Sequence, residues 1–190
     1  MTNVTIFGTG NMGTAIASVL AAGGASVEHI GSEGQGTITG DIVVLAVPYP
    51  ALNVIATTYA EQLAGKIVVD ITNPVDFSTF DSLVVPVGSS AAAELAKVLP
   101  SSKVLKAFNT NFAATLSSKK VGSVDTTVLI AGDDETAKQT LAGLVTAGGV
   151  RAVDAGSLKR AHELEALGFL QLALAAGEKI SWTGGFGLIS

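Results

Sequence analysis

The sequence predicts an α/β fold of the Rossmann type, with a doubly wound, mainly parallel sheet and a C-terminal helical segment. Short β-branched runs alternate with longer alanine- and leucine-rich segments, as strands and crossover helices do in such a fold. Four of the runs are almost continuously apolar, which is typical of parallel strands buried on both faces. A G-x-G-x-x-G pattern at residues 8–13 directly follows the first run.

The expected strands are the short apolar runs 3–7, 26–30, 42–47, 66–71, 103–108, 126–132 and 150–155. The expected helices are 11–23, 50–63, 90–98, 134–147 and 158–177. The first helix ends at Gly23–Gly24 and has one apolar face, which carries Met12, Ile16, Val19 and Leu20. Residues 31–41 show no helical period, so we expect a loop between the second and third strands.

Length and composition indicate one folded domain. The 190 residues, of which 48% are hydrophobic, suffice for one sizeable core. We therefore expect a single dinucleotide-binding domain over 1–190, with residues 156–190 forming a helix and tail packed on it. The net charge of −5 argues against nucleic acid and anionic membranes as partners. No apolar stretch reaches the ~20 residues of a membrane span, and the N-terminus lacks a signal-peptide pattern. We expect a cytoplasmic protein.

The segment GTGNMG predicts a dinucleotide-binding loop. In such loops the first glycine permits a tight turn, the second lets the backbone approach a pyrophosphate, and the third lets helix and strand pack closely. The N-terminus of the following helix offers N–H groups and a positive dipole end to phosphates. The alternative is a purely structural tight turn. The residues predicted to hold the pyrophosphate are Gly8, Thr9, Gly10, Asn11, Met12 and Gly13.

The end of the second strand bears on the choice between NADP and NAD. NAD-binding proteins usually place Asp or Glu there, to bind the ribose 2′-hydroxyl. Here Gly31 occupies that position and Ser32 can donate to a 2′-phosphate, whereas Glu33 would repel the phosphate or accept from a 2′-hydroxyl. We expect NADP to be preferred, with NAD as the alternative. His29, on the same strand, is a candidate for contact with the 2′-phosphate.

Several motifs occur in a characteristic order. They are GTGNMG, VVLAVPYPAL (43–52), VVDITNP (68–74), KAFNT (106–110), IAGDDE (130–135) and DAGSLKRAHELEALGF (154–169). As an ordered set covering nearly the whole chain, they resemble the deazaflavin (coenzyme F-420)-dependent NADP oxidoreductase family. The cytosolic domain of the six-transmembrane metalloreductases is a related module. The resemblance implies a Rossmann domain that binds NADP, hydride exchange with a flavin-like ring in a cleft beside the nicotinamide, and a homodimer.

The resemblance also implies roles for individual residues. Ser32 matches the serine that contacts the 2′-phosphate, but Glu33 stands where the family usually has a basic residue. One segment would lie beside the ribose on the nicotinamide side, namely Ala46, Val47, Pro48 and Tyr49. AFNTNF matches the segment facing the two redox rings, with Asn109 on the cofactor side and Thr110, Asn111 and Phe112 on the substrate side.

The position of Asn73 suggests a ligand contact without reference to the family. It stands at the carboxyl end of a strand, where open α/β sheets bind ligands. The alternative is a plain turn, which the pair Asn73–Pro74 also favours.

The remaining polar candidates favour structural roles. Residues 133–135 (Asp-Asp-Glu) precede a helix, so we expect capping rather than metal binding. We expect a surface or packing role for His162 and a structural hydrogen bond for Glu165. Trp182 lines either the acceptor cleft or a dimer contact. No acid–base constellation appears, so we assign no catalytic acid or base and no metal site.

Three functions remain open at this point. The leading one is an NADP-dependent oxidoreductase that exchanges hydride with a small-molecule acceptor such as a flavin, a deazaflavin or a quinone. A dehydrogenase of small hydroxy acids or imines is less favoured, because such enzymes commonly add a helical substrate domain and only one long helix follows Gly156. The third is a non-catalytic dinucleotide sensor or regulatory partner.

Overall fold

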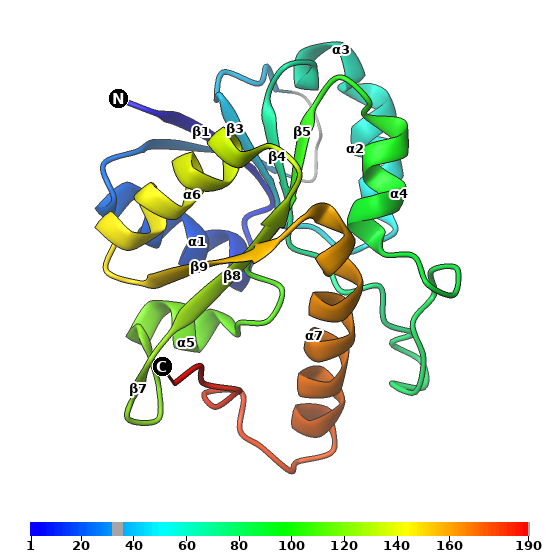
Figure 1. Ribbon diagram of the computed structural model, residues 1–190, viewed down its shortest axis with the longest axis vertical. Helices are drawn as coiled ribbons and strands as arrows, with labels where there is room; N and C mark the ends of the chain where they lie inside the picture. The colour runs from blue at the N-terminus through cyan, green and yellow to red at the C-terminus, as the bar shows by residue number, and fades with distance from the viewer. Residues whose placement is uncertain (32–35, 190) are drawn as a thin grey trace.

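The computed structural model describes residues 1–31 and 36–189, and its centre is a seven-stranded sheet (Figure 1). The strands lie in the order β2-β1-β3-β4-β5-β8-β9. Each neighbouring pair is parallel except β5 and β8, which are antiparallel. Their bounds are β1 (Asn3–Phe7), β2 (Ser26–Ile30), β3 (Ile42–Leu45), β4 (Ile67–Asp70), β5 (Lys103–Lys106), β8 (Thr127–Gly132) and β9 (Arg151–Gly156).

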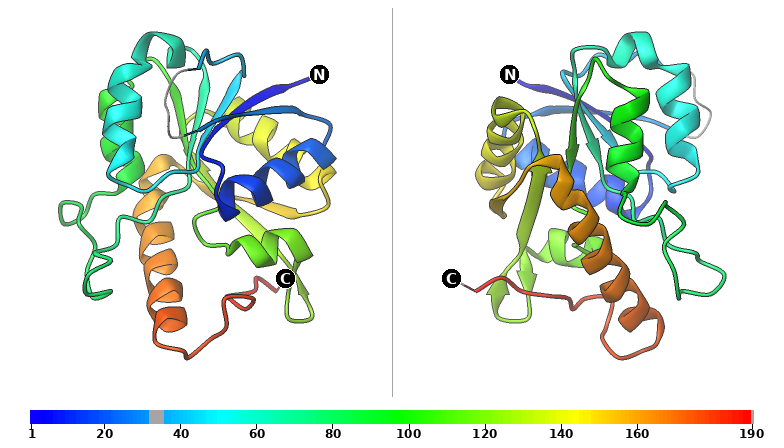
Figure 2. Two further views of the ribbon diagram at one scale, coloured as in Figure 1. Left: turned by 180° about the vertical axis from the view of Figure 1, so that it is seen from behind. Right: turned by 45° about the vertical axis from the view of Figure 1, so that its right-hand side comes forward.

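Helices cover both faces of this sheet (Figure 2). One face carries α1 (Asn11–Ala22), α5 (Ala113–Ser118) and α6 (Glu135–Ala147). The other carries α2 (Ala51–Thr58), α3 (Ala60–Leu63) and α4 (Ala91–Val98). The 3₁₀ turn η1 (Leu158–Arg160) leads into α7 (Ala161–Ala176), and a small hairpin joins β6 (Lys120–Val121) to β7 (Val124–Asp125). The doubly wound α/β fold predicted from the sequence is thus confirmed.

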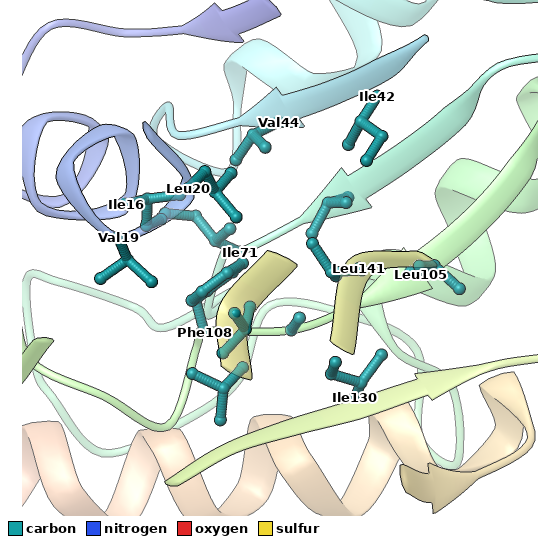
Figure 3. Close-up of a cluster of buried hydrophobic side chains, with 14 of the residues drawn as sticks. Ile16, Val19, Leu20, Ile42, Val44, Ile71, Leu105, Phe108, Ile130 and Leu141 are labelled. Carbon is teal, nitrogen blue, oxygen red and sulfur yellow. The ribbon is translucent and has the colours of Figure 1, made fainter. Parts of the chain in front are cut away.

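Alternating strand residues build two cores, one on each face of the sheet. In β3, Ile42 and Val44 face α1 and α6, whereas Val43 and Leu45 face α2 and α4. Figure 3 shows the first core, in which side chains of α1, α6 and the central strands meet. This two-sided burial explains why the central strands read as continuous apolar runs.

The structure differs from the predicted elements in a few places. The predicted helix 50–63 is broken into α2 and α3 at Tyr59, which has non-helical angles (φ −109°, ψ 14°). The predicted strand 103–108 ends at Lys106, because Phe108 takes the left-handed φ of 63°, which no strand contains. Helix α5 and the β6–β7 hairpin are not predicted from the sequence, because they are too short to show a period.

The C-terminal part of the chain packs against the carboxyl ends of β4 and β5. Helix α7 buries one stripe, which consists of Ala161, Leu164, Glu165, Gly168, Gln171 and Ala175. After α7 the chain turns back, and the tail up to residue 189 runs beside the β6–β7 hairpin (Figures 1 and 2). Arg151 Nη1 holds this tail by donating to the carbonyl of Leu188 at 3.1 Å. In the parts of the chain that the structure describes, no helix has the length and apolarity needed to cross a membrane.

Candidate functional site

A pocket of about 600 Å³ opens at the carboxyl ends of β1 and β3. Strand β1 lies between β2 and β3, so the strand order reverses here. Open α/β sheets bind ligands at such a switch point. We call this cavity the glycine-loop pocket. Its wall includes Gly8, Thr9, Gly10, Ile30, Gly31, Ala46, Val47, Pro48, Val54 and Thr58.

The three glycines of the GTGNMG loop serve different structural purposes. Gly8 has a φ of +107°, and a Cβ there would lie 2.2 Å from the carbonyl oxygen of Ala46. A Cβ on Gly13 would lie 2.5 Å from the carbonyl oxygen of Gly8. Gly10, by contrast, has an ordinary φ of −73°, and an added Cβ would meet nothing within 4 Å. The fold itself requires Gly8 and Gly13, whereas the absence of a side chain at Gly10 keeps open the space beside the loop.

The start of α1 is suited to an anion. Gly10 is the N-cap residue, no side chain caps the helix, and its first turn carries no acidic residue. The N–H groups of the first helical turn have no partner within a helix, so they are available to a phosphate. The residues present therefore fit the pyrophosphate of a dinucleotide.

Strand β2 holds the glycine loop in place. The N–H of Gly8 donates to the carbonyl of Ile30 at 2.9 Å. His29 Nδ1 lies 2.9 Å from the carbonyl oxygen of Gly8 and must carry the proton, because a carbonyl only accepts. Gly31 lines the pocket, and a Cβ there would meet nothing within 4 Å. Ser32 and Glu33, predicted to decide between NADP and NAD, lie outside the described residues.

A second cavity, of about 400 Å³, lies at the start of α1. Residues 8–10 line the glycine-loop pocket, and the next two residues, Asn11 and Met12, line the second cavity. We call it the asparagine cleft, after the four asparagines among its lining residues. The rest of its wall consists of Ile71, Asn73, Phe108, Asn109, Asn111, Phe112, Ala113, Ala114, Leu172 and Trp182. A ligand lying across the start of α1 would extend from one cavity into the other.

A pair of side-chain amides connects three elements at the cleft. Asn109 Nδ2 donates to Asn73 Oδ1 and to the carbonyl of Leu164, both at 2.9 Å. Asn73 Nδ2 donates in return to the carbonyl of Asn109 at 2.8 Å. Helix α7 approaches closely here, since a Cβ on Gly168 would lie 2.4 Å from Asn73 Oδ1. The loop after β4, the segment after β5 and α7 are thus fixed relative to one another.

Two amide oxygens at the cleft have no hydrogen-bond partner. Asn109 Oδ1 and Asn111 Oδ1 are buried, and neither accepts a hydrogen bond from any described residue. Both residues line the cleft, and Asn111 Nδ2 is already engaged with the carbonyl of Thr127 at 3.0 Å. A buried acceptor without a donor is costly, so these oxygens favour a ligand that donates hydrogen bonds.

Phe108 gives the segment after β5 its direction. Its φ of 63° is unusual for a bulky residue, and its side chain is fully buried. The N–H of Asn111 donates back to the carbonyl of Phe108 at 3.0 Å, which closes a turn. Backbone strain of this kind concentrates at functional sites. The turn brings residues 109–112 to the cleft.

A buried ion cluster lies between the strand ends and α7. Lys106 Nζ lies 2.9 Å from Asp70 Oδ2 and 2.8 Å from Glu165 Oε1, and these three side chains are at most 1% exposed. Lys106 also donates to the carbonyl of Thr72. One ammonium group faces two carboxylates, and burial raises the pKa of Glu165 above its ordinary value because it disfavours the charged form.

Glu165 also caps a helix, which confirms the structural hydrogen bond expected for it. Its carboxylate accepts from the N–H of Ala91 at 2.8 Å and of Ala92 at 3.3 Å, at the start of α4. The sequence analysis missed Asp70 and Lys106. Both are charged residues at the ends of apolar runs, and they face each other across neighbouring strands. Two opposite charges at the ends of neighbouring apolar runs were the signal in the sequence that could have predicted this ion pair.

The other residues singled out from the sequence line neither the glycine-loop pocket nor the asparagine cleft. Tyr49 lines neither of them; it borders a separate pocket of about 470 Å³ between α2 and α4. Thr110 accepts a hydrogen bond from Gln171 Nε2 at 3.1 Å through its carbonyl.

The predicted helix cap at Asp134 is confirmed, because its carboxylate accepts from the N–H of Ala137 at 2.8 Å. His162 Nδ1 contacts the carbonyl of Ser89 at 3.0 Å. Within residues 1–31 and 36–189, no three His, Asp or Glu side chains gather as a metal site would need.

Comparison with known proteins gives a consistent set of relatives. No protein-family model matches the chain. The F420-dependent NADP reductase of Methanocaldococcus jannaschii is 33% identical over 171 residues, which are 87% of this chain and 76% of that protein. Metalloreductase STEAP3 of Rattus norvegicus is 39% identical over 110 residues, covering 57% of this chain and 21% of that protein.

A solved structure shows the same fold over its full length. It comes from Arthrobacter sp. FB24, and its assignment as an F420-dependent NADP reductase is provisional. The two chains cover each other completely, with a TM-score of 0.85 and 24% identity. Identity over most of both chains with the methanogen enzyme settles the relationship: the chain belongs to the F420-dependent NADP reductase family.

Proposed function

We propose that this protein is an NADP-dependent oxidoreductase that exchanges hydride between the nicotinamide of NADP and a flavin-like acceptor, with a deazaflavin as the first candidate. The observation that carries the proposal is that consecutive residues line two cavities at the start of α1: residues 8–10 line the glycine-loop pocket, and Asn11 and Met12 line the asparagine cleft. Family membership supports the cofactor and the reaction class, because the Methanocaldococcus jannaschii relative is named for both NADP and F420.

Each cavity suits one part of the cofactor. The glycine-loop pocket would hold the adenosine and pyrophosphate, with Gly10 giving the backbone access and α1 supplying N–H groups. The segment 46–48, which lines the same pocket, would lie beside the ribose on the nicotinamide side, as the resemblance implies. The asparagine cleft would then take the nicotinamide and the acceptor ring side by side, with Asn109 and Asn111 offering free acceptor oxygens.

The protein would contribute orientation rather than acid–base chemistry. Hydride transfer is the chemistry that the bound cofactor supplies. The described residues that line the asparagine cleft are asparagine, alanine or larger apolar and aromatic residues, and none of them titrates. Holding two planar rings in contact and excluding water accounts for large rate effects without a general acid or base.

We propose in addition that the chain forms a homodimer. The long loop between β4 and α4 exposes apolar side chains, with Phe77 58% and Val84 53% exposed. Association through this loop would remove them from water. Sedimentation of the wild type and of Phe77→Asp tests the idea, since the variant should sediment as a monomer; a monomeric wild type would refute it.

Steady-state oxidation of NADPH with a panel of acceptors tests the reaction. We expect turnover with the deazaflavin coenzyme F-420 and slower turnover with FMN or a quinone, and a lower rate when NADH replaces NADPH. Consumption of NADPH only with an imine or a 2-oxo acid would indicate a dehydrogenase of small substrates instead. Tight NADPH binding in calorimetry without turnover on any acceptor would indicate a sensor.

A further inference from the structure

Trp182, in the tail that follows α7, lies in the wall of the asparagine cleft. It is the only tryptophan in the chain, it is 52% exposed, and it lines the asparagine cleft. One side of its indole contacts the ring of Phe112, with centroids 5.0 Å apart and planes at 51°. Trp182 thus combines one aromatic contact with a half-exposed surface in the wall of the cleft.

The turn that carries Trp182 is held by a series of hydrogen bonds. The N–H of Gly184 donates to the carbonyl of Ser181 at 2.9 Å, and that of Thr183 donates to Ser181 Oγ at 3.0 Å. Before the turn, the N–H of Lys179 donates to the carbonyl of Leu174 in α7 at 2.8 Å. These bonds fix where the turn leaves the helix.

The far side of the turn is anchored through a buried glutamine. Gln171 Oε1 accepts from the N–H of Phe186 at 3.0 Å, and Gln171 Nε2 donates to the carbonyl of Thr110 at 3.1 Å. Gln171 itself is only 2% exposed. One amide thus ties the tail, α7 and the segment 108–112 together, and it places the indole relative to Asn109 and Asn111.

The chemistry of the cleft indicates what the indole would contact. Two unpartnered amide oxygens call for a ligand with hydrogen-bond donors at its edge. The apolar walls call for a ligand with flat apolar faces, and they consist of Met12, Ile71, Phe108, Phe112, Leu172 and Trp182. A planar fused heterocycle with ring N–H groups meets both requirements, and stacked aromatic pairs gain stability beyond the area that they bury.

We propose that Trp182 is an acceptor-specificity residue, whose indole stacks on the fused ring of the redox acceptor and forms the outer wall of the asparagine cleft. This inference rests on the proposed function, because it takes the ring in the cleft to be the hydride acceptor. A fused planar acceptor gains the stacking contact, whereas a single-ring quinone is too small to fill the same space. The cofactor end of the site, at the glycine loop, does not involve the indole.

The emission of Trp182 gives a direct binding assay, because no other tryptophan contributes to it. FMN and coenzyme F-420, added separately to the NADP-saturated wild type, should quench it to saturation. Phe186→Leu is the matched control, since Phe186 is a 43% exposed aromatic residue on the same tail that does not line the cleft. Its emission should respond as the wild type does. Emission that stays unchanged up to concentrations at which turnover saturates overturns the inference.

Kinetics of Trp182→Leu separate the inference from the proposed function. The KM for the fused acceptor should rise about 3- to 10-fold, the loss expected for one aromatic stacking contact. The KM for NADPH and the KM for benzoquinone should rise less than the KM for the fused acceptor, because neither gains the full stacking contact, and Trp182→Phe should recover most of the loss. Wild-type turnover with an unchanged KM in Trp182→Leu overturns the inference and leaves the function standing. Saturable quenching without any turnover supports the stacking site and refutes the oxidoreductase.

Measuring the oligomeric state tests the remaining explanation, which is that Trp182 lies in a contact between two copies of the chain. If Trp182 were a contact between two copies of the chain, Trp182→Leu would shift the sedimentation coefficient towards that of a monomer, and the wild-type emission would change with protein concentration instead of ligand concentration. That result would overturn the inference.

Discussion

The glycine-loop pocket and the asparagine cleft are lined by consecutive residues at the start of α1, yet they are built in opposite ways. The pocket is formed by two continuous pieces of chain, β1 to α1 and β3 to α2, plus the end of β2, and backbone geometry shapes it. The cleft is formed by side chains from α1, the ends of β4 and β5, α7 and the tail. With the cofactor in the pocket and the acceptor in the cleft, as proposed, cofactor binding would depend on local backbone conformation and acceptor binding on tertiary packing.

Gly10→Val should produce the largest change, and it acts on the pocket alone. Valine suits the φ of −73°, and its Cβ meets no protein atom within 4 Å, so the fold should survive. The side chain would occupy the space of the pyrophosphate, and calorimetry should detect no NADPH binding. Gly143→Val, at an exposed site on α6 with equally open surroundings, is the control. If the Gly10→Val variant binds NADPH as tightly as the wild type, the loop is not the phosphate site.

Lys106→Met tests the support of the cleft. It would leave the carboxylates of Asp70 and Glu165 buried without a cation. Removing one partner of a buried ion pair costs about 3–5 kcal/mol of unfolding free energy, which denaturant titration measures. Lys97→Met, in an exposed pair with Glu94, should change little. Adding Glu165→Gln to Lys106→Met should recover part of the loss, and no recovery would mean that the charge cluster is not the cause.

Asn109→Ala separates the two regions by function. The variant loses the donor that holds Asn73 Oδ1 and the carbonyl of Leu164. We expect kcat to fall by about 10-fold through misoriented rings, while the dissociation constant for NADPH changes by less than about 2-fold. Asn53→Ala, at an exposed site on α2, serves as the control. Equal losses in turnover and NADPH affinity would break the distinction between the two cavities.

Glu33→Arg has the smallest expected effect, and it sharpens the cofactor assignment. The prediction rests on the sequence, where Glu33 follows Ser32 beyond the second strand. Removing a solvated repulsion of about 1 kcal/mol and adding a cation should tighten NADP binding by about 5- to 10-fold, with little change for NAD. Titration of both cofactors measures it. A wild type that prefers NAD, and an alanine variant that binds NAD more weakly, would make Glu33 the partner of the ribose 2′-hydroxyl.

The same contrast explains which features the sequence could predict. The strand–loop–helix unit at residues 3–22 was predictable because its period, its turn and its helix start are all local signals. The ion cluster was not, because Lys106 and Asp70 are 36 residues apart and Glu165 caps a helix 74 residues before it. The place of Trp182 in the wall of the asparagine cleft depends on the path of the tail after α7, for which the sequence holds no signal.

The position of Glu165 in the chain has a consequence for folding during synthesis. The ribosome synthesises Asp70, Lys106 and the start of α4 before α7. Until α7 is made, Lys106 has only the carboxylate of Asp70 as a partner, and α4 lacks the cap that Glu165 provides. Docking of α7 then completes the charge cluster, the cap and the amide pair of Asn109 in one step. A nascent chain that stops before this helix has a nearly complete sheet and no finished cleft, and its exposed core surface is what chaperones recognise.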